Sequence, residues 1–96
     1  MKWRFAWDKH KAATNLRKHG ISFEEASTVF DNPLAQLVDD EEHAADEQRE
    51  IIIGHSFRYR LLVTSFVRRA SYLIRIISSR LATKREQRDY EENTYN

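Results

Sequence analysis

The chain has 96 residues, of which 41% are hydrophobic, and its 16 lysines and arginines nearly balance 15 acids, leaving a net charge of +1. This size fits one domain spanning residues 1–96. The sequence has no apolar run long enough to span a bilayer and no segment typical of a secretory signal, so we expect a cytoplasmic protein that makes no membrane contact. The absence of cysteine excludes disulfides, thiolate metal sites and cysteine nucleophiles.

The chain begins with an alternating segment followed by a clearly delimited helix. From Met1 to Trp7 aromatic residues alternate with other side chains, which is typical of a short strand or an extended lead-in. Asp8 offers an N-cap, and Gly20 stands where a left-handed C-cap is common. The sequence therefore predicts a first helix that follows Asp8 and runs to about His19.

A second helix is predicted directly after the first. Ser22 and Glu25 have the spacing of a capping box, which favours a helix over residues Phe23 to Phe30. Pro33 follows, and the residue before a proline is pushed out of the α region. We therefore expect the second helix to end before Pro33.

Four apolar stretches after this point predict strands, and short links between the last three favour an antiparallel meander. They are Leu34–Val38, Glu50–Ser56, Arg60–Arg68 and Tyr72–Arg80. Thr83 and Glu86 repeat the capping-box spacing and indicate a last helix within Leu81–Glu92. The expected fold is α+β: two N-terminal helices, a four-stranded antiparallel sheet and a C-terminal helix, with the helices packed on one sheet face.

Opposite charges occupy different parts of the chain. Residues 31–50 hold eight acids against one arginine, a local balance of −7, and the tract from Asp39 to Glu47 is expected to be an exposed loop. Residues 58–90 hold nine cations against two acids, a balance of +7, and eight of the nine are arginine. Arginine forks match phosphate oxygens, so this half predicts a polyanionic partner.

An arginine pair is the first candidate site. Arg75 interrupts the apolar strand Tyr72–Arg80, and a charge there needs a groove, an anion or solvent. If neighbouring strands place Arg60 and Arg75 on the same face, both side chains are predicted to bind one phosphate. Alternation puts Arg80 on the strand face opposite Arg75. Either a bulge near Ser78 and Ser79 brings Arg80 to the same face, where it extends this site, or the two arginines do different work.

If the polyanionic partner is an RNA that the chain cleaves without a metal ion, the reaction also needs a base for the 2′-hydroxyl and an acid for the leaving 5′-oxygen. We predict Lys11 and Tyr90 for these roles in preference to His19, which at a helix end more often complements the helix dipole. His19 is kept as an RNA-binding residue. Further RNA-steering cations are expected on the last helix: Lys84, Arg85 and Arg88.

Several short motifs carry a resemblance that covers nearly the whole chain. They are Trp7-Asp8, Lys11, Asn15, Lys18-His19-Gly20, Phe23-Glu24-Glu25-Ala26, Phe30-Asp31, Arg60-Leu61-Leu62-Val63, Arg75-Ile76-Ile77-Ser78-Ser79-Arg80 and Arg85-Glu86-x-x-x-Tyr90-Glu91. In this order and spacing they resemble the BrnT family of ribonuclease toxins. Lys9 departs from the pattern, because many members have proline there.

The resemblance implies a RelE-like fold and a type II toxin that cleaves RNA without metal or cofactor. It also implies neutralisation by a BrnA-like antitoxin, contact with DNA only through that antitoxin complex, and a possible toxin homodimer within it. Two other interpretations remain open on the residues alone: a non-catalytic nucleic-acid-binding module, and an interaction protein whose acidic loop docks a basic partner.

Overall fold

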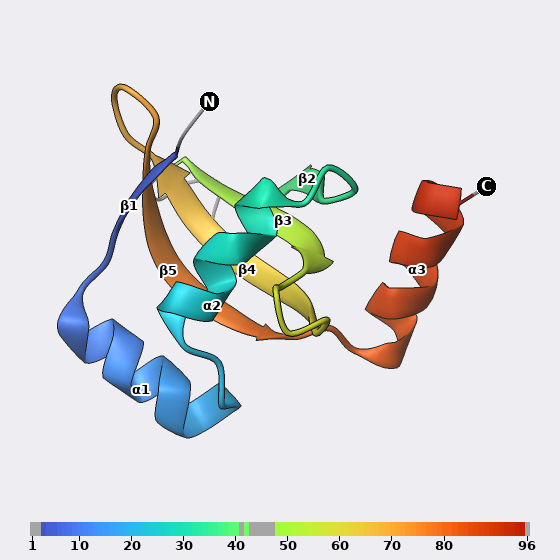
Figure 1. Ribbon diagram of the computed structural model, residues 1–96, viewed down its shortest axis with the longest axis horizontal. Coiled ribbons are helices and arrows are strands. Elements are labelled where there is room, and N and C mark those ends of the chain that lie inside the picture. Colours follow the sequence, from blue (N-terminus) through green and yellow to red (C-terminus); the bar gives the residue numbers. More distant parts are fainter. Residues whose placement is uncertain (1–2, 41, 43–47, 96) are drawn as a thin grey trace.

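The computed structural model describes residues 3–40, 42 and 48–95, and folds into a sheet with helices around it (Figure 1). The strands are β1 (Arg4–Ala6), β2 (Gln36–Asp39), β3 (Arg49–His55), β4 (Leu61–Arg68) and β5 (Leu73–Leu81). The helices are α1 (Lys9–His19), α2 (Phe23–Ser27), the 3-10 turn η1 (Thr28–Asp31) and α3 (Lys84–Tyr95). The predicted α+β class is confirmed.

The sheet is five-stranded and mixed, with the order β1-β5-β4-β3-β2. Strands β2 to β5 pair antiparallel, as predicted, whereas β1 pairs parallel to β5, with Phe5 opposite Ile74. The prediction of a four-stranded antiparallel sheet is therefore wrong in detail. The alternating segment before Trp7 is a strand rather than a lead-in, and it covers only one end of the β5 edge.

Both ends of α1 form the caps that the sequence predicts. The Asp8 carboxylate accepts hydrogen bonds from the backbone N–H groups of His10 and Lys11, at 2.7 and 3.1 Å. These bonds, that from Lys11 first, hold the pKa of the Asp8 carboxyl below its usual value. Gly20 ends the helix with a φ of 70°, in the left-handed region that favours glycine. The position of α1 is thus fixed locally.

The second helix is shorter than predicted. Ser22 caps it by accepting the backbone N–H of Glu25 at 3.0 Å, but α2 gives way after Ser27 to the 3-10 turn η1. Only half of the expected capping box forms, because the Glu25 carboxylate faces β4 instead of the helix start. A tertiary partner has displaced the local one.

The core lies between the sheet and the helices α1 and α2. It contains buried apolar side chains from both layers: Ile21, Phe23, Ala26, Val29, Ile52, Leu62, Phe66, Ile74 and Ile76. Strand residues alternate between faces, so the neighbours of these positions, including Ile51, Val63, Ser65 and Arg75, lie on the opposite side. We call that side of the sheet the outer face.

The last helix begins with the predicted capping box, in which Thr83 and Glu86 exchange hydrogen bonds of 2.9 and 3.1 Å. It spans Lys84–Tyr95, later than the sequence predicted. Helix α3 lies on the far side of the molecule from α1 (Figure 1). Its Tyr90 packs against His55, and Gln36 donates to the Tyr90 carbonyl, both from outer-face positions. Packing of all helices on one face is therefore a wrong prediction.

Only part of the acidic tract can be placed, because residues 41 and 43–47 lie outside the described residues. Within residues 3–40, 42 and 48–95, no group of three histidines or acids has the geometry to hold a metal ion. None of the described helices is long and apolar enough to cross a membrane.

Candidate active site

Arg60 is held by a buried carboxylate on the helix side of the sheet. The Arg60 Nε donates to Glu25 Oε2 at 2.9 Å. One terminal nitrogen of Arg60 pairs with Glu25 Oε1, and the same nitrogen donates to the Gly20 carbonyl at 3.2 Å. Ser56 donates to Glu25 as well, at 2.7 Å. The Arg60 guanidinium holds the pKa of the Glu25 carboxyl below its usual value against the opposing effect of burial. Arg60 thus fixes α2 to β4.

Arg75 lies elsewhere, so the predicted convergence with Arg60 is wrong. Ile74 and Ile76 enter the core, which turns Arg75 to the outer face. Arg75 is paired with Val67 of β4. Val67 comes seven residues after Arg60, which directly precedes this strand, so Arg60 and Val67 are about 23 Å apart. Arg75 instead lines a cavity of about 500 Å³ with Arg4 and Arg69. One phosphate cannot contact both predicted arginines.

Of the two alternatives for Arg80, the structure contains the bulge, just before Ser78. Ser65 pairs with Ser78 and Phe66 pairs with Ile76, which leaves Ile77 as the extra residue. Arg80 therefore returns to the outer face. It does not share the Arg75 cavity; its guanidinium forms two parallel hydrogen bonds with Glu86, at 2.7 and 2.9 Å.

The ion pair between Arg80 and Glu86 makes the stability of the fold depend on pH in the acid range. The hydrogen bond from Arg80, followed by the Thr83 backbone, lowers the pKa of Glu86 from 4.5 to about 2. A carboxyl with a depressed folded-state pKa stabilises the fold fully above its unfolded pKa, and the contribution is lost as pH falls from about 4.5 to about 2. Because Arg80 is 42% exposed, we expect no more than about 1 kcal/mol.

Thermal unfolding of the parent chain and of Glu86→Gln tests this. The parent should unfold at the higher temperature above pH 5, and the gap should close toward pH 2. An equal gap across that range would show that the pair has no pH-dependent effect on stability.

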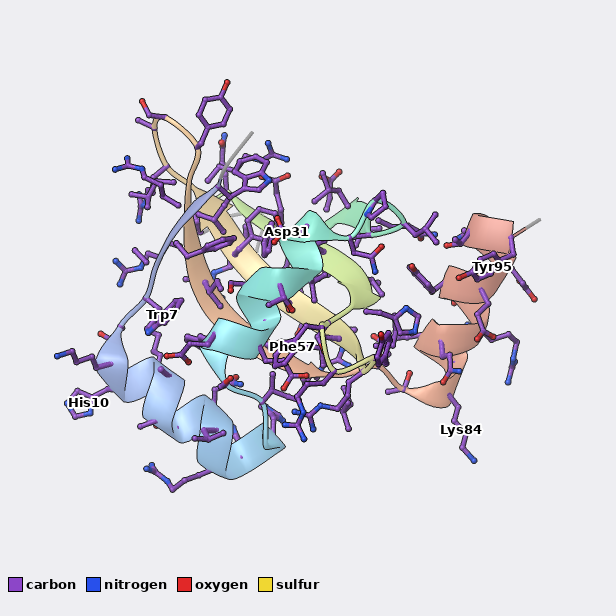
Figure 2. All side chains as sticks on the ribbon, in the orientation of Figure 1. Trp7, His10, Asp31, Phe57, Lys84 and Tyr95 are labelled. Atoms are coloured by element: carbon purple, nitrogen blue, oxygen red, sulfur yellow. The ribbon has the colours of Figure 1, made fainter. Side chains whose placement is uncertain are left out.

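Tyr90, the predicted acid, is buried, with only 2% of its surface exposed. Its hydroxyl donates to the Leu34 carbonyl at 2.9 Å, and burial raises its pKa. The three predicted steering residues of the same helix, Lys84, Arg85 and Arg88, are exposed. Figure 2 shows Lys84 on α3 at the opposite side of the molecule from His10 on α1. The structure therefore separates Tyr90 and these cations from Lys11.

Lys11 and His19 do meet, in a groove between α1 and β5. This groove, which we call the α1 groove, has a volume of about 290 Å³. It is lined by His10, Lys11, Thr14, Asn15, Lys18, His19, Ile77 and Ser78. Strand β1 pairs with β5 only as far as Arg75, so the rest of the β5 edge is open to α1. Arg60, bonded to the Gly20 carbonyl, stands next to the His19 end of the helix.

Asn15 joins the two walls of the α1 groove. Its side-chain amide donates to the carbonyls of Ser79 and Ile21, at 2.8 and 2.9 Å, and its oxygen accepts the Ser79 N–H at 3.0 Å. The amide thus satisfies both backbone groups of Ser79 at the open edge of β5, as a neighbouring strand would. Asn15 is buried and holds α1 against β5.

The sequence-based site prediction did not include five polar residues of the groove: His10, Thr14, Asn15, Lys18 and Ser78. The signal that the sequence offered was helical spacing. Lys18 and His19 follow Lys11 by seven and eight residues, which places all three along one side of a helix. The groove residues offer ammonium, imidazole and hydroxyl groups and no carboxylate. This set can bind a phosphodiester and exchange protons with it.

Comparison with known proteins agrees with this chemistry. The sequence model described as "Ribonuclease toxin, BrnT, of type II toxin-antitoxin system" matches residues 7–86. The crystal structure of the Brucella abortus ribonuclease toxin BrnT is similar in fold, with a TM-score of 0.67 and 22% sequence identity, covering 86% of this chain and 100% of that one. None of the curated proteins matches. The chain belongs to the BrnT family of ribonuclease toxins of type II toxin-antitoxin systems, which act on RNA and are paired with an antitoxin.

Proposed function

We propose that the α1 groove holds the scissile phosphodiester and that this toxin cleaves RNA there without a metal ion. The observation that carries the proposal is the meeting of Lys11, Lys18 and His19 on one groove beside the β5 edge. Magnesium and calcium sites use oxygen ligands, mainly carboxylates, and no carboxylate lines the groove. Its own cations would neutralise the charge that develops on the phosphate.

The two reacting oxygens need different partners. The 2′-hydroxyl attacks the adjacent phosphorus after losing its proton to a base, and the leaving 5′-oxygen takes a proton from an acid. Eight residues of helix place the Cα atoms of Lys11 and His19 about 12 Å apart, so long side chains from the two ends can approach one phosphodiester from both sides. Lys18 stands beside His19 to bind the phosphate oxygens, and His19 takes the place predicted for Tyr90.

Incubation of the purified chain with RNA in excess chelator tests this function. We expect fragments with 2′,3′-cyclic phosphate and 5′-hydroxyl ends, since the attacking oxygen belongs to the substrate. Salt-sensitive retention of RNA without fragments would favour a non-catalytic binding module. No RNA affinity at all would favour a protein that acts through its acidic tract.

We also propose a cytoplasmic complex with a BrnA-like antitoxin, which alone contacts DNA and holds two copies of this chain. Family membership supports the antitoxin, and the finer points follow from the resemblance. Co-expression with the neighbouring reading frame, followed by light scattering, should give a complex with two toxin copies. A mass corresponding to one toxin copy would contradict the homodimer.

A further inference from the structure

A second, smaller pocket lies on the outer face, close to the α1 groove. Its volume is about 150 Å³, and its walls include Arg49 of β3, Ser65 of β4, and Ser78 and Arg80 of β5. The bulge at Ile77 brings Ser78 and Arg80 onto this face. Ser78 lines this pocket and the α1 groove alike. The two cavities therefore adjoin at Ser78.

Two residues of this pocket each carry a buried polar atom that has no hydrogen-bond partner. Arg49 Nε and Ser65 Oγ are the buried side-chain nitrogen and oxygen atoms without a hydrogen bond in the described part of the chain. Buried donors left unpaired cost about 1–3 kcal/mol each, and most buried polar groups in folded proteins are satisfied. That both unpaired atoms belong to residues of one pocket indicates a ligand that accepts hydrogen bonds there.

The remaining walls restrict what this ligand is. Ile51 and Val63 supply an apolar surface, and Asp40 and Glu42 add carboxylates to the lining. These carboxylates reduce the attraction that Arg49 and Arg80 would exert on a bare phosphate. An unpaired nucleobase instead has a flat apolar face together with donors and acceptors on its edges. The mixed lining therefore favours a base over a phosphate.

We propose that this pocket binds one guanine of the RNA strand whose scissile phosphodiester lies in the α1 groove, an inference that rests on the function proposed above. Guanine presents two adjacent acceptors, O6 and N7, which arginine donors match. Its N1–H and N2–H₂ groups can donate hydrogen bonds to a carboxylate. Arg49 and the carboxylate of Glu42 provide both kinds of partner, and adenine, with an amino group in place of O6, fits them less well.

Binding of 2′-O-methyl trinucleotides tests the proposal apart from catalysis, because these strands lack the attacking hydroxyl. A trinucleotide with guanine between two adenines should bind the intact chain at least about tenfold more tightly than the all-adenine strand. Arg49→Met, which keeps an apolar stem but removes every donor, should bring the two affinities within about twofold. Ser65→Ala should weaken the preference in the same direction.

The matched control is Arg68→Met. Arg68 belongs to the adjacent strand β4 and pairs with Glu50 at 2.8 Å, and its strand partner Ile74 lies in the core on the helix side. The guanine preference should survive this change. Equal binding of both trinucleotides, a preference for another base, or a guanine preference that Arg49→Met leaves intact would overturn the proposal. Since none of these readouts needs cleavage, a chain that binds guanine but fails to cut RNA would refute only the proposed function.

Discussion

RNA cleavage by the double variant Lys11→Ala/His19→Ala is expected to be at least about 100-fold slower than cleavage by the parent chain, because positioned proton carriers contribute about 10²–10⁴-fold. Both side chains are exposed on α1 and make none of the contacts that hold α1 in place. Circular dichroism and the urea midpoint should therefore stay close to those of the parent. Single-turnover assays on a short RNA measure the loss.

The single variants separate the two roles. A proton carrier acts in the chemical step, so its loss should lower kcat with little change in KM. We expect this result for both His19→Ala and Lys11→Ala. A residue that only binds phosphate would instead raise KM and leave kcat close to that of the parent.

The matched control removes cations from the far side of the molecule. Lys84→Ala/Arg88→Ala deletes two exposed charges of α3, a larger change in net charge than the groove variant makes at neutral pH. We expect a rate within about threefold of the parent, since distant surface charges act mainly on encounter. Equal losses in both double variants would contradict the α1 groove as the cleavage site and favour diffuse electrostatic binding.

Local features of the fold were predictable from the sequence, because each depends on neighbouring residues. The Asp8 cap, the Gly20 C-cap and the Thr83–Glu86 capping box involve bonds over two to four residues. The strands β3 to β5 follow from largely apolar runs. The bulge was one of two alternatives that the five-residue spacing of Arg75 and Arg80 left open.

The arrangement of the site depends on contacts between distant residues, and there the sequence-based reasoning failed. Glu25 fits a capping box, yet its carboxylate binds Arg60, 35 positions later. Tyr90 belongs to a charged helix, but α3 turns it toward the Leu34 carbonyl. Strand β1 reaches β5 only in the folded chain. Charge and residue type indicated a polyanionic partner, whereas the separation of Arg75 from Lys11 depends on which part of the β5 edge α1 covers.

Asn15 belongs to a locally predicted helix and also makes contacts with residues distant in the sequence. We expect Asn15→Ala to lower the free energy of unfolding by about 3 kcal/mol. The change leaves three buried partners without their bond: the Ser79 N–H, the Ser79 carbonyl and the Ile21 carbonyl. Each unpaired group costs about 1–3 kcal/mol, and hydration at the open β5 edge keeps the sum near the lower end. Urea unfolding of the parent and variant measures the difference.

Two further variants distinguish hydrogen bonding from packing at this position. Asn15→Leu fills the same space without a donor or acceptor, so it should be as destabilising as Asn15→Ala if the bonds matter. Thr14→Ala, one residue earlier and exposed, should change the unfolding free energy by less than about 0.5 kcal/mol. A loss below about 1 kcal/mol for both Asn15 variants would show that α1 is held to β5 by its apolar contacts alone. Because Lys11 and Ser78 belong to opposite walls of the α1 groove, loosening α1 should also slow RNA cleavage at temperatures where the variant is still folded.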